Sequence, residues 1–249
     1  MYNVFLMWKN TRMIVLVAVC AAIYAATLIA FKTAIPLIPG ITEVRVAGVF
    51  PPVFGILFGP AGAWGLGFGN LIGDIFGGTL TPSSIAGFFG NFLLGYLPYT
   101  MWVNLVPFTE KTYEWKVKSW RSWTGYILIT VISSAACAIV ISAVVDALGV
   151  VPYAVLSKII TLNDTIGGMV GVILLIAVYD VIKGQLNLFW PDVVNTEEMR
   201  KGIAPPLGAW IVTLGATAGI VGGMLFPGLS VNVIGWGSIA VIIAGCLLL

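Results

Sequence analysis

The sequence predicts an all-α polytopic membrane protein with about eight membrane spans and both termini in the cytoplasm. The first observation is composition: 59% of the 249 residues are hydrophobic, 9% are charged, and the mean hydropathy is +1.05. A soluble domain carries about 25% charged residues, so this chain has too few charges to cover a surface that faces water. The second observation is that the apolar residues form segments of membrane-spanning length. The third is a one-sided distribution of lysine and arginine.

The spans follow from the thickness of the bilayer, because a hydrocarbon core of about 30 Å requires about 20 apolar residues of helix. The second and third apolar segments are joined only by Phe58-Gly59-Pro60, so we expect one tight hairpin of two shorter spans. Pro51 and Pro52 predict that the second span is bent or partly non-helical. The eight segments, bounded by charges, proline or glycine, are 12–31, 46–60, 61–79, 85–107, 122–149, 157–182, 206–227 and 232–249.

Basic residues predict the orientation, because the cytoplasmic loops of membrane proteins are enriched in lysine and arginine. With the N-terminus inside, the outer side holds only Lys32, Arg45 and Lys158. The cytoplasmic side holds the other basic residues, which are Lys9, Arg12, Lys111, Lys116, Lys118, Arg121, Lys183, Arg200 and Lys201. This bias places both termini in the cytoplasm.

Several classes of function are excluded by what the chain lacks. A net charge of +2 offers no basic field for nucleic acid. The absence of histidine removes the usual general base and the commonest metal ligand. Cys20, Cys137 and Cys246 lie far apart inside apolar runs, which indicates neither a disulfide framework nor a zinc site. We therefore expect no catalytic residue, metal or cofactor in this chain.

Two spans carry small residues at helical spacing. The third span has a small residue at every fourth position, which lets two helix backbones touch in lipid, so we expect this helix to be pressed against a neighbour along its length. These positions are Ala61, Gly65, Gly69, Gly73 and Gly77. The first span repeats the spacing at Ala18, Ala22 and Ala26. That alanine face serves either internal packing or the docking of another helix, and spacing alone favours internal packing.

The 46–79 hairpin gives an argument about depth. If both arms are helical, Arg45 and Asp74 each lie about 14 residues from the tip at Gly59-Pro60 and reach nearly the same height near the outer surface. Ionisable groups at membrane depth are costly and mark functional sites. Either an Arg45–Asp74 ion pair or joint contact with a ligand fits this placement.

Most other polar residues of the spans also fall in the outer half, above an apolar base. A channel or proton relay would need polar groups at every depth, so this asymmetry indicates a cavity that opens outward and binds an external solute. The loop 32–46 is stiffened by proline and serves either as a lid over that cavity or as an ordinary connector. The candidate substrate-binding residues are Arg45, Asn70, Asp74, Asn91, Tyr96, Lys158, Asn163 and Asp164.

The chain resembles the substrate-binding S components of energy-coupling factor (ECF) vitamin transporters. The resemblance covers about residues 12–183 and rests on four motifs in order, with the N-terminus inside. The motifs are AVCAAIYAA at 18–26, EVR at 43–45, VFGILFGPAGA at 53–63 and GNLIGD at 69–74. By this resemblance, residues 1–183 form a six-helix substrate-binding core, 184–204 a cytoplasmic linker, and 205–249 an additional transmembrane hairpin that departs from the family pattern.

The resemblance also implies partners and a ligand. In that family the alanine face of the first span contacts a transmembrane coupling subunit driven by two ATPases, which assigns Ala18, Ala22 and Ala26 to docking rather than packing. The phosphate-binding patterns GxxxxGKS and GxxxxGKT are absent, so any use of ATP comes from partner chains. The family binds its vitamin in the outer half of the membrane. A queuosine precursor, riboflavin and other heterocyclic vitamins all stay open, because aromatic residues such as Trp64, Tyr96, Tyr99 and Trp102 suit any planar ring.

Two other functions compete with an S component in the cell membrane. A stand-alone secondary transporter is expected to carry internal repeats with matching broken helices, and the two halves of the sequence show no convincing repeat. An integral membrane enzyme would have to use Asp74, Asp164 or a tyrosine, and no nucleophile–base pair is evident. The sequence therefore favours a binding subunit without catalysis of its own.

Overall fold

The computed structural model describes residues 2–31, 36–38, 42–43, 45–194, 202–226 and 231–249, most of which are helical. The other described elements are short. They are two 3-10 segments, η1 (Met7–Lys9) and η2 (Val46–Val49), a π-helical segment, η3 (Val181–Gln185), and an antiparallel strand pair, β1 (Pro36–Ile38) and β2 (Thr42–Glu43). The α-helices are α1 (Tyr2–Leu6), α2 (Thr11–Phe31), α3 (Phe50–Phe58), α4 (Pro60–Phe76), α5 (Ser83–Met101), α6 (Trp120–Ala147), α7 (Tyr153–Asp180), α8 (Trp190–Val193), α9 (Pro205–Leu225) and α10 (Val231–Leu248).

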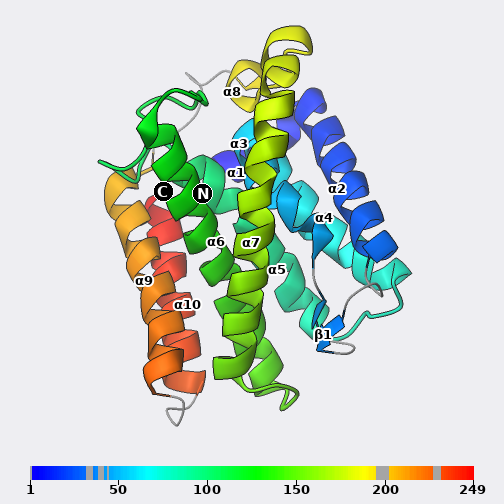
Figure 1. Ribbon diagram of the computed structural model, residues 1–249, viewed down its shortest axis with the longest axis vertical. Helices are drawn as coiled ribbons and strands as arrows, with labels where there is room; N and C mark the ends of the chain where they lie inside the picture. Colours follow the sequence, from blue (N-terminus) through cyan, green and yellow to red (C-terminus); the bar gives the residue numbers. More distant parts are fainter. Residues whose placement is uncertain (1, 32–35, 39–41, 44, 195–201, 227–230) are drawn as a thin grey trace.

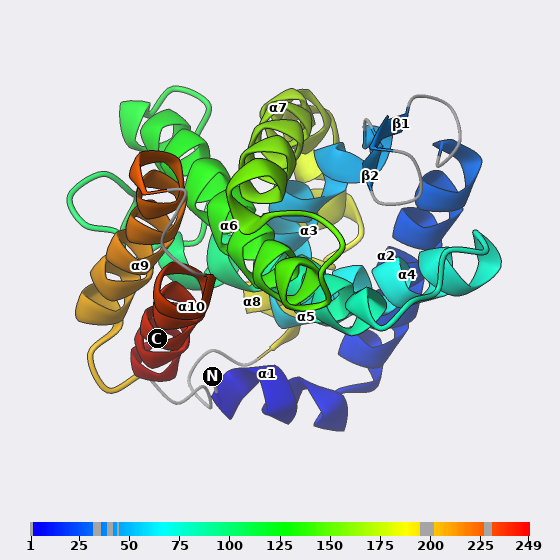
Figure 2. The same cartoon turned by 90° about the horizontal axis from the view of Figure 1, so that it is seen from below.

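The long helices form one bundle (Figure 1), in which α6 and α7 lie between α2 and α4 on one side and α9 and α10 on the other. We call the end that holds β1, β2 and the turn from α6 to α7 the loop end. The opposite end, which holds α8 and the connection from α5 to α6, is the α8 end. Figure 2 looks along the bundle and shows the same order from α2 to α9.

The helices agree closely with the segments that the sequence predicts. Four helical stretches are long and apolar enough to cross a membrane: Thr11–Phe31, Trp120–Ala147, Tyr153–Val193 and Pro205–Leu225. Shorter apolar helices cover Val46–Phe58 and Val233–Leu248. The all-helical membrane class is therefore confirmed, while the count of eight spans and the cytoplasmic position of both termini stay predictions.

The hairpin of α3 and α4 follows the predicted pattern with one refinement. Val46–Val49 is a 3-10 segment, and Pro51 and Pro52 stand in the first turn of α3, where a missing backbone N–H costs nothing. The prolines thus begin the helix instead of breaking it. Gly59 turns the chain with φ of +52°, and a Cβ there would lie 2.6 Å from Cγ of Trp190. Only glycine fits this position, because both the dihedral and the contact exclude a side chain.

The small-residue ladder of α4 packs against α2, as the sequence predicts. A Cβ on Gly65 would lie 2.4 Å from Cβ of Cys20, and a Cβ on Gly69 would lie 2.9 Å from the carbonyl oxygen of Ala21. These distances leave no room for a side chain, so the backbones of α2 and α4 approach closely. This contact fixes the rotation of α2 and therefore decides which of its side chains face the interior.

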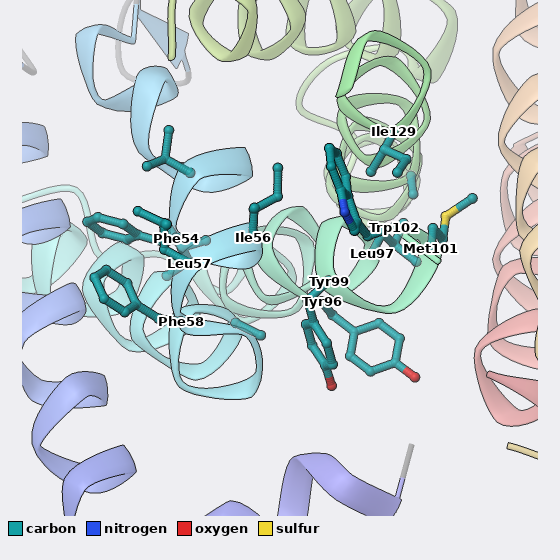
Figure 3. Packing of buried hydrophobic residues seen from close by; sticks show 14 of the residues in the cluster. Phe54, Ile56, Leu57, Phe58, Tyr96, Leu97, Tyr99, Met101, Trp102 and Ile129 are labelled. Carbon is teal, nitrogen blue, oxygen red and sulfur yellow. The ribbon is translucent and has the colours of Figure 1, made fainter. Parts of the chain in front are cut away.

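The core at the α8 end is rich in aromatic residues (Figure 3). Phe54 and Phe58 of α3, Tyr96 and Tyr99 of α5, and Trp102, which directly follows α5, are buried there. Residues 181–194, which include the first part of the expected linker 184–204, form η3 and α8. Trp190 of α8 is buried, with ring centroids 5.5 Å from Tyr99 and 4.6 Å from Tyr113. This end of the bundle is consequently closed by packed rings.

The last two helices, α9 and α10, pack against each other and against α6. The hydroxyl of Tyr153 donates to the carbonyl oxygen of Gly219, and the hydroxyl of Tyr96 donates to that of Cys246. These bonds join the C-terminal hairpin to α7 and α5. The boundaries at 183 and 205 stay predictions, and residues 195–201 of the proposed linker lie outside the described residues.

Candidate functional site

A chain of polar side chains crosses the bundle near the loop end, inside otherwise apolar helices. The hydroxyl of Tyr24 on α2 donates to Oδ1 of Asn91 on α5 over 2.6 Å. Nδ2 of Asn91 donates to Oδ1 of Asn70 on α4 over 2.9 Å, and Nδ2 of Asn70 donates to Oδ2 of Asp74 over 3.4 Å. Tyr24, Asn70 and Asn91 are all buried. We call these four residues, with Arg45, Asn163 and Asp164, the polar network.

The amide of Asn91 has one orientation only. Its Nδ2 also donates to the backbone carbonyl oxygen of Gly87 over 2.8 Å, and a carbonyl can only accept. Its Oδ1 lies 3.4 Å from Nη1 of Arg45, and a guanidinium can only donate. Both ends of the amide are therefore fixed by groups of unambiguous chemistry, so every donor from Tyr24 to Asn70 points along the chain toward the carboxylate of Asp74.

The second part of the network lies between η2 and α7. Nη1 of Arg45 is 3.9 Å from Oδ1 of the buried Asp164, and the backbone N–H of Arg45 donates to Oδ1 of Asn163 over 3.3 Å. Arg45 thus joins α7 to Asn91 and so connects the two halves. An ion pair with both partners largely withdrawn from water persists only when further hydrogen bonds hold it, and Asn91 and Asn163 supply them.

Close backbone contacts position these elements. A Cβ on Gly167 would lie 2.9 Å from Cα of Gly48, so η2 and α7 touch beside Arg45. A Cβ on Gly87 would lie 2.7 Å from Nδ2 of Asn70, so glycine is needed there to leave space for the amide. The thiol of Cys137 on α6 lies near Asp164 and Arg45.

The structure brings together six of the eight candidate binding residues. Nη1 of Arg45 lies 3.9 Å from the carboxylate of Asp164. The carboxylate of Asp74 accepts from Asn70 and from the hydroxyl of Thr79. An Arg45–Asp74 ion pair or joint contact of the two with a ligand stays a prediction. The six are Arg45, Asn70, Asp74, Asn91, Asn163 and Asp164.

Tyr96 and Lys158 do not join the network. Five residues after Asn91, Tyr96 is turned by about 140° around α5, and its hydroxyl donates to the carbonyl oxygen of Cys246 on α10. Its assignment to the site stays a prediction. Lys158 is half-buried near the start of α7 and forms no hydrogen bond or ion pair with the part of the chain that the structure describes.

The planar-ring role expected of the aromatic residues is also not supported by their positions. The indole N–H of Trp64 donates to the carbonyl oxygen of Val4, and the ring packs edge-on against Trp8. Tyr99 packs against Trp190, and Trp102 against Trp115. Because these rings fill the core around α1, α8 and the connection from α5 to α6, they lie apart from the polar network.

Tyr24 is the residue of the network that sequence reasoning missed. It lies in the AVCAAIYAA motif, which drew attention to alanines, yet a phenol hydroxyl inside an apolar span is a signal in its own right. The glycine ladder of α4 decides which face of α2 turns toward the interior. The ladder is visible in the sequence, and it is the signal that could have placed Tyr24 inside the bundle. Of the 32–46 loop, β1 and β2 are described, whereas 32–35, 39–41 and 44 lie outside the described residues, so its role as a lid stays a prediction.

The alanine face of α2 points away from the bundle. Ala18, Ala22 and Ala26 are exposed, whereas Ala21 and Ala25 on the adjoining face are buried. The spacing alone favoured internal packing of the alanine face. In the part of the chain that the structure describes, Ala18, Ala22 and Ala26 are instead left exposed. A strip of small side chains is left on the surface of α2, opposite the buried Tyr24.

Comparison with known proteins identifies the family. A family model described as QueT transporter matches residues 14–180, nearly the range over which the sequence motifs resemble S components. No curated protein and no solved structure matches the chain. The matched range runs from the start of α2 to the end of α7 and contains the whole polar network, while α9 and α10 follow it. The chain therefore belongs to the QueT transporter family of membrane S components and is a multi-pass protein of the cell membrane.

Proposed function

We propose that this chain is the substrate-binding subunit of an ATP-driven ECF importer and that it captures a queuosine precursor, a 7-deazaguanine base, from outside the cell. The family match supports the class of transporter. The observation that carries the assignment of a site is the polar network, which joins side chains of α2, α4, α5 and α7 with Arg45 inside an apolar bundle.

The chemistry of the network suits such a base. A guanine-type ring presents a row of N–H donors beside a carbonyl oxygen, so its partner needs both acceptors and donors. Asp74 and Asp164 provide carboxylates, each of which accepts several hydrogen bonds at once. Arg45 and the amide of Asn163 provide donors. The base would lie among these groups, under the loop 32–46, which acts as a lid in this proposal.

Two features support a role as a subunit rather than a complete pump. The sequence carries no phosphate-binding loop for ATP. The exposed strip of Ala18, Ala22 and Ala26 offers a surface where a second helix approaches closely without a side chain in the way. We propose that this strip docks the transmembrane coupling subunit, which is itself driven by a pair of ATPases.

Two measurements test the proposal separately. The purified full chain is titrated calorimetrically with 7-aminomethyl-7-deazaguanine, and with riboflavin as a control; we expect saturable binding of the first only. The chain is also co-expressed with a coupling subunit and its ATPases, and co-purification of all of them is expected. Binding without co-purification would favour a stand-alone transporter, and absence of binding would remove the substrate from the proposal.

A further inference from the structure

Tyr24 connects the proposed docking helix to the polar network. Its side chain is fully buried, and its Cβ lies 3.0 Å from the position that a Cβ on Gly69 would occupy. The first atom of the side chain is therefore held closely against α4, and the buried ring ends at Asn91. Its hydroxyl ends 2.6 Å from Oδ1 of Asn91, which is the shortest hydrogen bond within the network.

The hydroxyl of Tyr24 is the strong donor to Asn91. The other donor to the same oxygen, Nη1 of Arg45, is 3.4 Å away, near the limit of a hydrogen bond. The same nitrogen lies 3.9 Å from the carboxylate of Asp164. If Tyr24 did not satisfy Asn91, the guanidinium would be drawn toward Asn91 and away from Asp164. The hydrogen bond from Tyr24 therefore influences whether the guanidinium of Arg45 lies closer to Asn91 on α5 or to Asp164 on α7.

We propose that Tyr24 is a positioning residue for substrate, because its hydroxyl holds Asn91, Asn70 and Arg45 in the arrangement that receives the ligand. The inference rests on the proposed function, and Tyr24 itself need not touch the substrate. Its hydroxyl donates to Asn91, and the hydrogen bonds that Asn91 and Asn70 donate in turn all run toward the carboxylate of Asp74. Loss of its hydroxyl leaves the size of the core nearly unchanged but removes the strong donor to Oδ1 of Asn91.

The test compares tyrosine with analogues that separate volume from hydrogen bonding. Tyr24→Phe removes the donor, 4-methylphenylalanine at position 24 restores the volume without a donor, and 4-aminophenylalanine restores a donor. Tyr153→Phe is the matched control, because the hydroxyl of Tyr153 is equally buried and donates over 3.1 Å to the carbonyl oxygen of Gly219, outside the network. Affinity of the full-length proteins for 7-aminomethyl-7-deazaguanine is measured by calorimetry, together with Tm.

We expect the phenylalanine and 4-methylphenylalanine proteins to bind about tenfold more weakly than wild type, the effect of one hydrogen bond. The 4-aminophenylalanine protein should recover most of that loss, while Tyr153→Phe changes affinity less than about twofold and lowers only Tm. Equal binding by wild type and Tyr24→Phe, or a loss that the amino analogue does not recover, overturns the inference. Absence of binding by wild type contradicts the proposed function as well and removes the basis of the inference.

Discussion

At the scale of residues, the depth of the polar groups was predictable, whereas the contact of Arg45 with Asp164 was not. A helix rises about 1.5 Å per residue whatever its sequence, so counting from Gly59 places Arg45 and Asp74 correctly near one end of the bundle. The contact of Arg45 with Asp164 depends on the rotation of α7, which is fixed by the contact of Gly167 with Gly48. That contact joins residues far apart in the sequence, and no local pattern reveals it.

Gly87→Ala tests whether the amide of Asn70 is part of the binding geometry. The new methyl group would lie 2.7 Å from Nδ2 of Asn70 and would push the amide away from Asp74 and Asn91. We expect binding of 7-aminomethyl-7-deazaguanine to weaken by about 1–3 kcal/mol, the cost of leaving buried hydrogen-bonding groups unpaired. Calorimetric titration of the purified variant provides the measurement.

Gly95→Ala is the matched control for this variant, about two turns further along α5. Its methyl group would lie 2.8 Å from Cα of Ala63 and from Cδ1 of Leu66 on α4, so it crowds the packing of α5 against α4 and touches no residue of the network. This control should lower Tm while affinity stays near the wild-type value. Equal losses of affinity in both variants would show that crowding of α5 in general, and not Asn70, is responsible.

At the scale of elements, α2 carries two faces with different neighbours. Cys20, Tyr24 and Leu28 are buried against α4, while Ala18 and Ala22 are exposed. The small-residue spacing of both helices was visible in the sequence. Which of the two alanine rows faces outward was not, because Ala21 and Ala25 have the same spacing as Ala18 and Ala22, and only contact with the glycines of α4 distinguishes them.

Ala22→Leu tests the exposed row as a docking surface. Ala22 is exposed in the part of the chain that the structure describes, so we expect Tm and ligand affinity of the solitary protein to stay unchanged. Uptake of the base by cells that contain the coupling subunit should be abolished, because the larger side chain separates the two helices. Ala218→Leu adds the same volume to an exposed alanine on α9 and should leave uptake intact. Loss of ligand affinity in Ala22→Leu would mean that the site and this face are not separate.

At the scale of the whole molecule, the sequence anticipated a core followed by an added hairpin, and the family match ends at residue 180. The hairpin of α9 and α10 nevertheless packs on α6 and shares hydrogen bonds with α5 and α7. The short helices α1 and α8 were not predicted. Each is held by a tryptophan, the half-buried Trp64 for α1 and the buried Trp190 for α8, whose partners lie far away in the chain.

The orientation of the bundle in the membrane is tested by chemical labelling of intact cells. Leu80 at the loop end and Val117 at the α8 end are 57% and 51% exposed, whereas the native cysteines, Cys20, Cys137 and Cys246, are buried and provide a low background. We expect Leu80→Cys to react with a membrane-impermeant maleimide and Val117→Cys to react only after the cells are opened. The opposite pattern would place the polar network on the cytoplasmic half and would contradict uptake from outside.

The shortness of α3 has a consequence for how the protein is made. Its nine residues measure about 13 Å, less than half of the hydrocarbon thickness, so α3 alone is too short to cross the membrane as a helix. We expect it to enter the bilayer together with α4, as one hairpin whose backbone ends are shielded by other helices. Those helices include α5 and α7, and α7 is synthesised much later. A chain that stops before α7 is therefore expected to leave part of α3 exposed to lipid.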